Sequence, residues 1–460
     1  MATLADALAA HLGPMLGRLQ PAARVALEKS ACWAWVTRPQ ALEGSLHLLI
    51  LALPILPPEL LLAAAALPIA FYAAQVISGT APRSRTPVDL PLAVYYALAV
   101  LATATSVDPR GSLRDLAINT CAFGLFLAIT RAADRKMVLR LLNTLLLAGT
   151  LVAAYGVYQY LVGVPVDKAW YDVKLHPELR VRVYSTFGNP NVLAEYLGLV
   201  IPFGLAGFVS QRRPQGRLLL ASSLAVMTAC LLFTYSRGGW LGLAVAVLVF
   251  VLFRERRVMW ILPAVALLSY LAAPEVVLNR VASMVSLKDA SNAHRVGVWL
   301  ASLAMLRDFW LTGVGLGHRA FMQVYAEYKL KGRFAWHSHS LFLEQAIELG
   351  IVGLAVFLWV IFTVYRTGLH YLRPGRRDPT SHAPVAAPPG RAVRAAADPA
   401  PAIVMAGLAA VSGTLFHGLV ENILYMATIT ISFWMVVALT IATGKIWETA
   451  AGGVSRSGGS

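Results

Sequence analysis

Runs of about 20 apolar residues recur along the whole chain, and they restrict its fold more than any other feature. Of the 460 residues, 58% are hydrophobic and only 13% are charged. A run of about 20 apolar residues is long enough for a helix to cross the hydrocarbon core of a bilayer, and soluble domains contain few such runs. The sequence therefore predicts an all-α polytopic membrane protein.

Twelve transmembrane helices are predicted, nine before residue 275 and three from residue 340 onward. The apolar stretch from Leu46 to Ile77 is too long for one span, and Pro57-Pro58 divides it into two short spans. The other ten predicted spans cover 88–106, 113–131, 137–160, 191–209, 218–236, 238–253, 258–274, 340–365, 402–420 and 423–443.

The same pattern divides the chain into five parts. The first part has no apolar core or cleavage site typical of a signal peptide, and its mixture of Leu, Ala, Trp and basic residues indicates an amphipathic helix on the cytoplasmic surface. The long polar segment ahead of the last three spans is predicted to hold interfacial helices. The parts are 1–42 (amphipathic), 43–274 (spans one to nine), 275–340 (outer segment), 341–443 (last three spans, with a Pro- and Ala-rich cytoplasmic linker at 372–401) and 444–460 (tail).

The distribution of basic residues predicts the orientation. With the N-terminus inside, 24 of the 39 Lys and Arg residues lie in inner segments and 7 in short outer loops. The remaining 8 lie in the long outer segment, where the positive-inside rule has little weight. Both termini are therefore predicted to be cytoplasmic. The net charge of +16 then reflects loop orientation and anionic head groups, and does not indicate nucleic-acid binding.

This orientation places the unusual polar residues on the outer side. Arg237 lies between two apolar spans that are joined by almost no loop, followed by two glycines that allow close approach of a ligand. Arg182 lies ahead of the turn at Asn189-Pro190, where Asn191 is a predicted N-cap of the next helix. A snorkelling arginine and an ordinary polar loop stay open as alternative interpretations of these two places.

The outer segment 275–340 is basic and partly helical. Apolar residues at helical spacing from His294 to Trp310 predict an amphipathic helix with Arg295 at its start, and the glycines at 313–317 should end it. The eight basic residues exceed the four acids by four, so this segment should attract anionic substrates at a membrane surface.

Arg182, Arg237 and Arg295 together indicate phosphate binding, because arginine holds phosphate with two parallel hydrogen bonds and stays charged at any working pH. A lipid-linked phosphate or pyrophosphate fits this demand. Histidine can accept a proton near neutral pH, which makes His339 a candidate general base for a hydroxyl group. His337 and His339, two residues apart, should project to different faces of a helix, and we expect no metal and no cofactor. The outer acids are too scattered for a carboxylate-based glycosidase.

Several motifs resemble the O-antigen ligase and polymerase superfamily over roughly residues 180–365. They are Arg182–Asn191, Tyr235–Gly242, Arg295 with Trp299, Gly313–Gly317, and His339-Ser340 ahead of Glu348–Gly353. The resemblance implies a metal-independent inverting glycosyltransferase that uses an undecaprenyl-pyrophosphate-linked glycan. By motif position, Arg237 and Arg295 correspond to the family's essential arginines and His339 to its essential histidine. The additional His337 leaves open which imidazole is the base, and His339 is preferred because it directly precedes the residues that open the helix.

Within the superfamily, one large outer segment before the last catalytic span favours the ligase, with the lipid A-core oligosaccharide as acceptor at the periplasmic face of the inner membrane. A polymerase of the same superfamily and a lipid or glycan transporter are the alternatives. Transport is less favoured, because the predicted spans are apolar in their middles and the polar residues lie on one side. The remaining candidates are auxiliary residues (His337, Asn191, Tyr184) and acceptor-binding basic residues (Arg319, Lys329, Lys331, Arg333).

Overall fold

The computed structural model describes residues 30–457 apart from 83, 166–180, 256, 258–259, 261, 272–274, 284–289, 331–332 and 374–397. Within these residues the regular secondary structure is helical throughout, which confirms the predicted class. The helices are α3 Ala31–Val36, α4 Pro39–Ala52, α5 Pro58–Ile77, α6 Asp89–Ala104, α7 Pro109–Ala132, α8 Arg135–Val162, α9 Pro190–Ser210, α10 Pro214–Phe233, α11 Arg237–Arg254, α12 Leu262–Leu271, α13 Glu275–Ala282, α14 Ala290–Asp308, α15 Gly317–Tyr328, α16 Leu341–Tyr371, α17 Ala400–His417, η5 Ile423–Tyr425 and α18 Ala427–Ser457. Most of the predicted amphipathic segment 1–42 and of the linker 372–401 lies outside the described residues.

Nine of the described helices are long and apolar enough to cross a membrane, so the chain has the character of a multi-pass membrane protein. They are α5, α7, α8, α9, α10, α11, α16, α17 and the first part of α18. The other three predicted spans correspond to α4, α6 and α12, which have 14, 16 and 10 residues. Within the described residues these three helices are shorter than the roughly 20 residues that a span needs, so the total of twelve spans stays a prediction.

Local sequence explains where many of these helices begin. Proline, which lacks the N–H that the first turn leaves unused, opens α4, α5, α7, α9 and α10. The Ser236 hydroxyl caps α11 by accepting the N–H of Gly239 at 3.4 Å. At α9 the cap is Asn189, whose side chain accepts the N–H of Asn191 at 2.9 Å. The prediction of Asn191 as the cap was therefore wrong, because Pro190 already lies in the helix.

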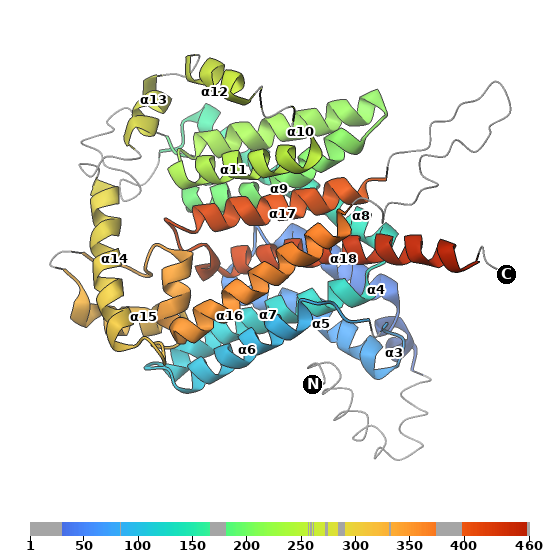
Figure 1. The fold of residues 1–460 in the computed structure, drawn as a ribbon, viewed down its shortest axis with the longest axis horizontal. Coiled ribbons are helices and arrows are strands. Elements are labelled where there is room, and N and C mark those ends of the chain that lie inside the picture. The colour runs from blue at the N-terminus through green and yellow to red at the C-terminus, as the bar shows by residue number, and fades with distance from the viewer. Residues whose placement is uncertain are drawn as a thin grey trace. The chain divides into compact units, whose positions relative to one another are not determined.

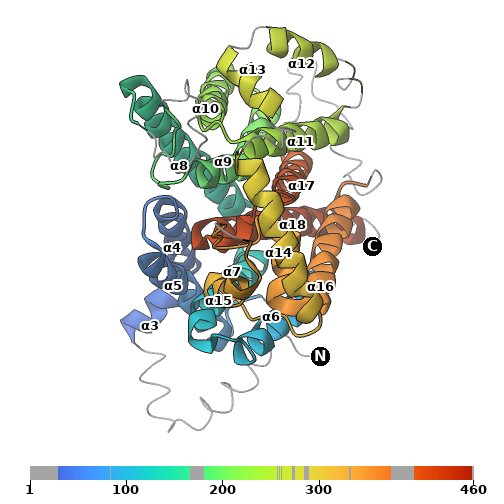
Figure 2. The ribbon, with the colours of Figure 1, turned by 90° about the vertical axis from the view of Figure 1, so that its left-hand side faces the viewer.

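The chain forms two compact units. The first comprises 1–148, 293–363 and 418–438, and the second comprises 149–292, 364–417 and 439–460. In the first unit α5 packs between α4 and α7, and α7 also contacts α6 and α15 (Figure 2). In the second unit α9 packs against α10, α11 and α17 (Figure 1).

The glycine-rich segment 313–317 pairs with a break in α16. Gly350 has a φ of 70° and a ψ of 177°, which interrupts the helical hydrogen bonding. The carbonyl groups of Ile347 and Glu348 accept the N–H groups of Val314 at 2.8 Å and Gly315 at 3.2 Å instead. Because buried backbone groups need partners, the segment and the break satisfy each other. These glycines therefore join two elements of the first unit.

Replacing Gly350 by alanine should destabilise the protein. A Cβ atom there would lie 2.2 Å from the Leu311 carbonyl oxygen, at a φ that L residues rarely adopt. We expect a cost of at least about 1–3 kcal/mol, seen as a lower melting temperature in detergent and less folded protein in membranes. Gly198→Ala is the matched control, because a Cβ at Gly198 meets nothing within 4 Å. A Gly350→Ala variant that melts like the Gly198→Ala variant would contradict this account.

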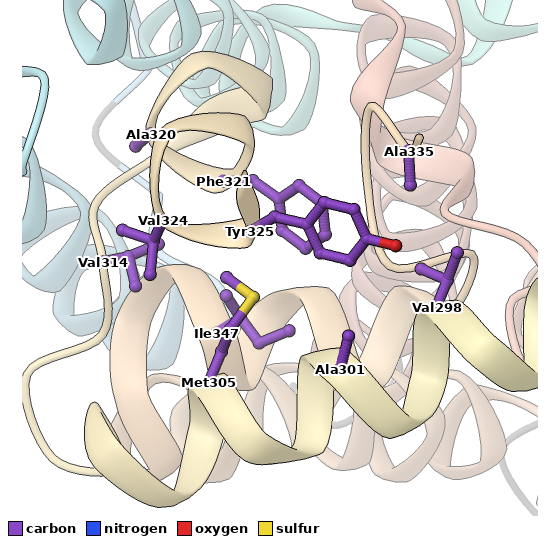
Figure 3. Packing of buried hydrophobic residues seen from close by; sticks show 10 residues of the cluster. All are labelled: Val298, Ala301, Met305, Val314, Ala320, Phe321, Val324, Tyr325, Ala335 and Ile347. Carbon is purple, nitrogen blue, oxygen red and sulfur yellow. The ribbon is translucent and has the colours of Figure 1, made fainter. Parts of the chain in front are cut away.

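The helix predicted from His294 to Trp310 is present as α14, but its apolar residues divide between two faces. Val298, Ala301 and Met305 are buried against Phe321 and Tyr325 of α15 (Figure 3). By contrast, Leu303 and Trp310, which belong to the predicted apolar pattern, are 53% and 56% exposed. One side of α14 is therefore core, and this core fixes α14 and α15 relative to each other.

Candidate active site

Residues 337–340, the histidine loop, form a short non-helical segment just ahead of α16. Hydrogen bonds to three other residues hold its backbone in place. His339 has a φ of 52°, a conformation uncommon for a residue other than glycine. The Ser338 N–H donates to Oε2 of Glu344 at 2.6 Å, and the Trp299 indole donates to the His339 carbonyl at 3.2 Å. The Leu341 N–H donates to the carbonyl of Gly418 at 2.7 Å. A strained conformation that the surroundings enforce is typical of functional residues.

Glu421, which follows α17, lies beside both imidazoles. Its Oε1 is 2.9 Å from Nδ1 of His339 and 3.7 Å from Nε2 of His337. Its Oε2 accepts a hydrogen bond from Arg295 at 3.0 Å. Burial alone would raise the pKa of Glu421, but His339, Arg295 and His337 outweigh it and hold that pKa well below its usual range. Glu421 is therefore an ionised carboxylate between an arginine and two histidines.

The hydrogen bonds assign different roles to the two imidazoles. Nδ1 of His337 accepts the backbone N–H of His339 at 3.2 Å, so the proton of neutral His337 lies on Nε2. Burial lowers the pKa of His337 to about 3, which keeps it neutral. His339 instead donates from Nδ1 to the Glu421 carboxylate, which leaves its Nε2 as a proton acceptor. The His339 side chain is also more exposed, 21% against 9% for His337.

Within the described residues, one group of side chains could hold a metal ion. It consists of His337, His339 and Glu421. Their ligand atoms all lie within 4.8 Å of one another, and imidazole with carboxylate is a donor set that zinc accepts. A cation there would lie close to the Arg295 guanidinium, whose charge opposes it. The expectation that the imidazoles point to different faces of a helix was wrong, because these residues precede the helix. The absence of a metal stays a prediction.

A cavity of about 30 Å³ adjoins the histidine loop in the first unit. His337, Asp115, Glu344 and Glu348 line part of it. Oε1 of Glu344 is buried and accepts no hydrogen bond from the described residues. The volume suits one or two water molecules and is far too small for a sugar ring. The cavity therefore can hydrate the buried acids behind residues 337–340, and it has no room for a sugar ring.

The structure places Arg182 and Arg237 in the second unit, both buried. Arg182 donates from Nε to the Thr234 carbonyl at 2.8 Å and from a terminal nitrogen to Oδ1 of Asn191 at 3.3 Å. Arg237 begins α11. It donates to the carbonyl and hydroxyl of Ser283 at 2.9 and 3.0 Å, and to Oδ1 of Asn292 at 2.9 Å. Both guanidinium groups thus donate hydrogen bonds to oxygen atoms that lie next to helix N-termini. Arg295 lies in the first unit.

The predicted acceptor-binding residues have different surroundings. Arg319 of α15 and Lys329, just past its end, are exposed. Arg333 donates to the Ala293 carbonyl, which ties the loop to the first turn of α14. Lys331 lies outside the described residues. Tyr184, one of the auxiliary candidates, is half-buried. Its carbonyl accepts the Phe187 N–H at 3.1 Å, which closes a turn. Of the acceptor-binding candidates that the structure describes, Arg319 and Lys329 are therefore the exposed cations.

Two acids at this site were missed by the sequence analysis. Glu421 is a carboxylate directly after a predicted span, and Glu344 lies inside another. An ionisable residue within or next to a span is costly unless it has a specific partner, and this signal was available in the sequence. What the sequence did not show is which residues those partners are.

Part of the chain matches a known protein family. The family model described as O-antigen ligase matches residues 222–358. This range contains Arg237, Arg295, His337, His339 and Glu344, whereas Arg182 and Glu421 lie outside it. No curated protein matches the chain.

Proposed function

Because the chain carries an O-antigen ligase superfamily domain at residues 222–358, we propose that it transfers a glycan from undecaprenyl pyrophosphate to a hydroxyl group of the lipid A-core. The reaction is metal-independent and inverts the anomeric carbon. It takes place at the periplasmic face of the inner membrane, with both termini in the cytoplasm. The observation that supports the chemistry best is the 2.9 Å contact between His339 Nδ1 and Glu421 Oε1.

His339 is the general base of the proposed reaction. Its Nε2 takes the proton of the acceptor hydroxyl, and the oxygen attacks the anomeric carbon as the bond to the pyrophosphate oxygen breaks. The resulting imidazolium is stabilised by the Glu421 carboxylate, which Arg295 holds in place at 3.0 Å. His337 is an auxiliary residue, because its Nδ1 is already used by the His339 N–H.

Arg182, Arg237 and Arg295 bind the pyrophosphate and stabilise its departing charge. Guanidinium groups suit this role because they remain charged and present parallel N–H donors to phosphate oxygen atoms. The lipid A-core acceptor is also anionic. We propose that the exposed Arg319 and Lys329, with Lys331 and Arg333, attract it to the histidine loop.

Arg237→Lys and Arg295→Lys should each impair transfer, because lysine keeps the charge but loses the planar fork that holds phosphate. We expect about a tenfold or larger loss in kcat/KM, since a charge-assisted hydrogen bond contributes about 1.5–3 kcal/mol. Arg307→Lys, an exposed position on α14, is the control. The assay uses purified protein in vesicles with lipid-linked glycan. Near-normal activity in both variants would identify these arginines as structural.

The test of the function itself combines that assay with a deletion strain. Purified protein should join the lipid-linked glycan to the core acceptor at an unchanged rate in excess chelator. A strain without the gene should accumulate polymer on the lipid carrier, with lipopolysaccharide that ends at the core. Single repeats on the carrier would instead indicate a polymerase, and movement of the lipid-linked glycan across the vesicle membrane without transfer would indicate a transporter.

A further inference from the structure

Two exposed aromatic side chains lie just ahead of the histidine loop. Phe334 is 57% exposed and Trp336 is 56% exposed. Ala335, which lies between them, is buried in the core that joins α14 to α15 (Figure 3), and His337, which follows them, is also buried. In an extended chain, successive side chains point to opposite faces. The alternation of exposed and buried residues therefore directs both aromatic rings away from the core.

The two rings are held in a defined arrangement. The ring centroids of Phe334 and Trp336 are 5.3 Å apart, and the planes meet at 89°, the edge-to-face geometry that aromatic pairs favour. Trp336 also lies 6.0 Å from the imidazole of His318 in α15. The Tyr325 hydroxyl donates to the carbonyl of Arg333 at 3.4 Å, which fixes the backbone where this segment begins. A ligand therefore meets rings that are already in place, which lowers the entropy cost of binding.

The chemistry of an exposed aromatic pair suits a sugar ring. The face of an aromatic ring carries partial negative charge. One face of a pyranose presents several C–H groups, which are weak donors to such a surface, while its hydroxyl groups stay at the rim. Binding sites for small polar molecules commonly combine aromatic side chains with a few polar groups in this way.

The pair adjoins the site already described. Trp336 is bonded directly to His337, and its Cα atom lies within about 11 Å of that of His339, because only three residues separate them. His318, against which Trp336 packs, lines the same cavity as His337. Arg319, proposed above to attract the acceptor, follows His318 in α15 and is exposed. Exposed aromatic residues also occur at membrane interfaces, but the position next to the proposed base favours a sugar over a lipid.

We propose that Trp336 stacks against a sugar ring of the acceptor oligosaccharide, with Phe334 at the edge of the same subsite, and thereby brings the acceptor hydroxyl to His339. This inference rests on the proposed function for the identity of the acceptor. The acceptor is the substrate concerned because its hydroxyl must reach Nε2 of His339, which lies in the same short segment.

The test uses the full-length protein in nanodiscs, with core oligosaccharide freed from lipid A as the soluble probe. Trp336→Leu keeps an apolar side chain but removes the ring face. It should weaken binding of the probe about 3–10-fold and raise the KM for the core acceptor to the same extent, with an unchanged KM for the lipid-linked donor. Trp336→Tyr, which retains a ring, should bind nearly as well as the wild type. Trp310→Leu is the matched control, because Trp310 is also 56% exposed and should leave probe binding unchanged.

Two results would overturn the inference while the proposed function stands. One is transfer by Trp336→Leu with wild-type affinity for the probe and wild-type KM for the acceptor. The other is an equal rise of both KM values in Trp336→Leu and Trp310→Leu, which would show that these side chains contact the bilayer. If the wild-type protein binds the oligosaccharide through Trp336 but transfers no glycan to the core, the sugar subsite stands and the proposed function fails. If the wild-type protein transfers glycan but binds no oligosaccharide freed from lipid A, the inference fails.

Discussion

Replacing His339 by alanine should lower the rate of glycan transfer about 10²–10⁴-fold, the usual contribution of a general base. The physical reason is that His339 Nε2 is the proton acceptor that the hydrogen bonds leave available, since Nδ1 donates to Glu421 at 2.9 Å. The measurement is kcat with purified protein in vesicles, together with the affinity for the lipid-linked donor. Donor affinity should persist, because the imidazole acts on the acceptor hydroxyl.

His337→Ala is the internal comparison for this prediction. His337 is buried and its Nδ1 accepts the His339 N–H at 3.2 Å, so its loss should loosen the loop and reduce the rate less than His339→Ala does. His337→Gln, which can still accept that N–H, should recover part of the activity. If the order of the two alanine variants is reversed, His337 is the base. If neither variant loses activity, both imidazoles are structural.

Replacing Glu421 by glutamine should reduce transfer about 10²–10⁴-fold, the scale seen when a carboxylate that orients a catalytic histidine becomes an amide. An amide N–H next to His339 Nδ1 would favour the tautomer with its proton on Nε2, which cannot accept another. Glutamine also removes the negative charge that stabilises the imidazolium and pairs with Arg295 at 3.0 Å. The rate should fall in kcat, with little change in the KM for the donor.

Two variants sharpen the Glu421 prediction. Glu421→Asp keeps the charge on a shorter side chain and should retain part of the activity. Glu327→Gln changes an exposed acid of α15 and should behave like the wild type. A Glu421→Gln variant with near-normal kcat would show that the carboxylate only stabilises the fold around the loop.

The amino-acid sequence alone was enough to predict an all-helical, multi-pass membrane protein. Hydropathy is a local property, since about 20 consecutive residues decide whether a helix can span a bilayer. The division at Pro57-Pro58 was also predicted from the sequence, and in the structure α4 ends at Ala52 and α5 begins at Pro58. The start of α16 just after His339-Ser340 was equally accessible. The order of the motifs also predicted Arg237, Arg295 and His339 as site residues.

The partners that these residues contact became known only from the tertiary structure. Glu421 is 82 residues from His339 and 126 from Arg295, and nothing in the local pattern pairs them. Likewise, the glycines at 313–317 were recognisable as a motif, but their pairing with the break at Gly350 was not. Arg280 likewise donates from Nε to the carbonyl of Tyr235, which lies 45 residues away in the sequence. Such hydrogen bonds form only when helices distant in sequence pack at one place, so packing, and not local composition, determined these partners.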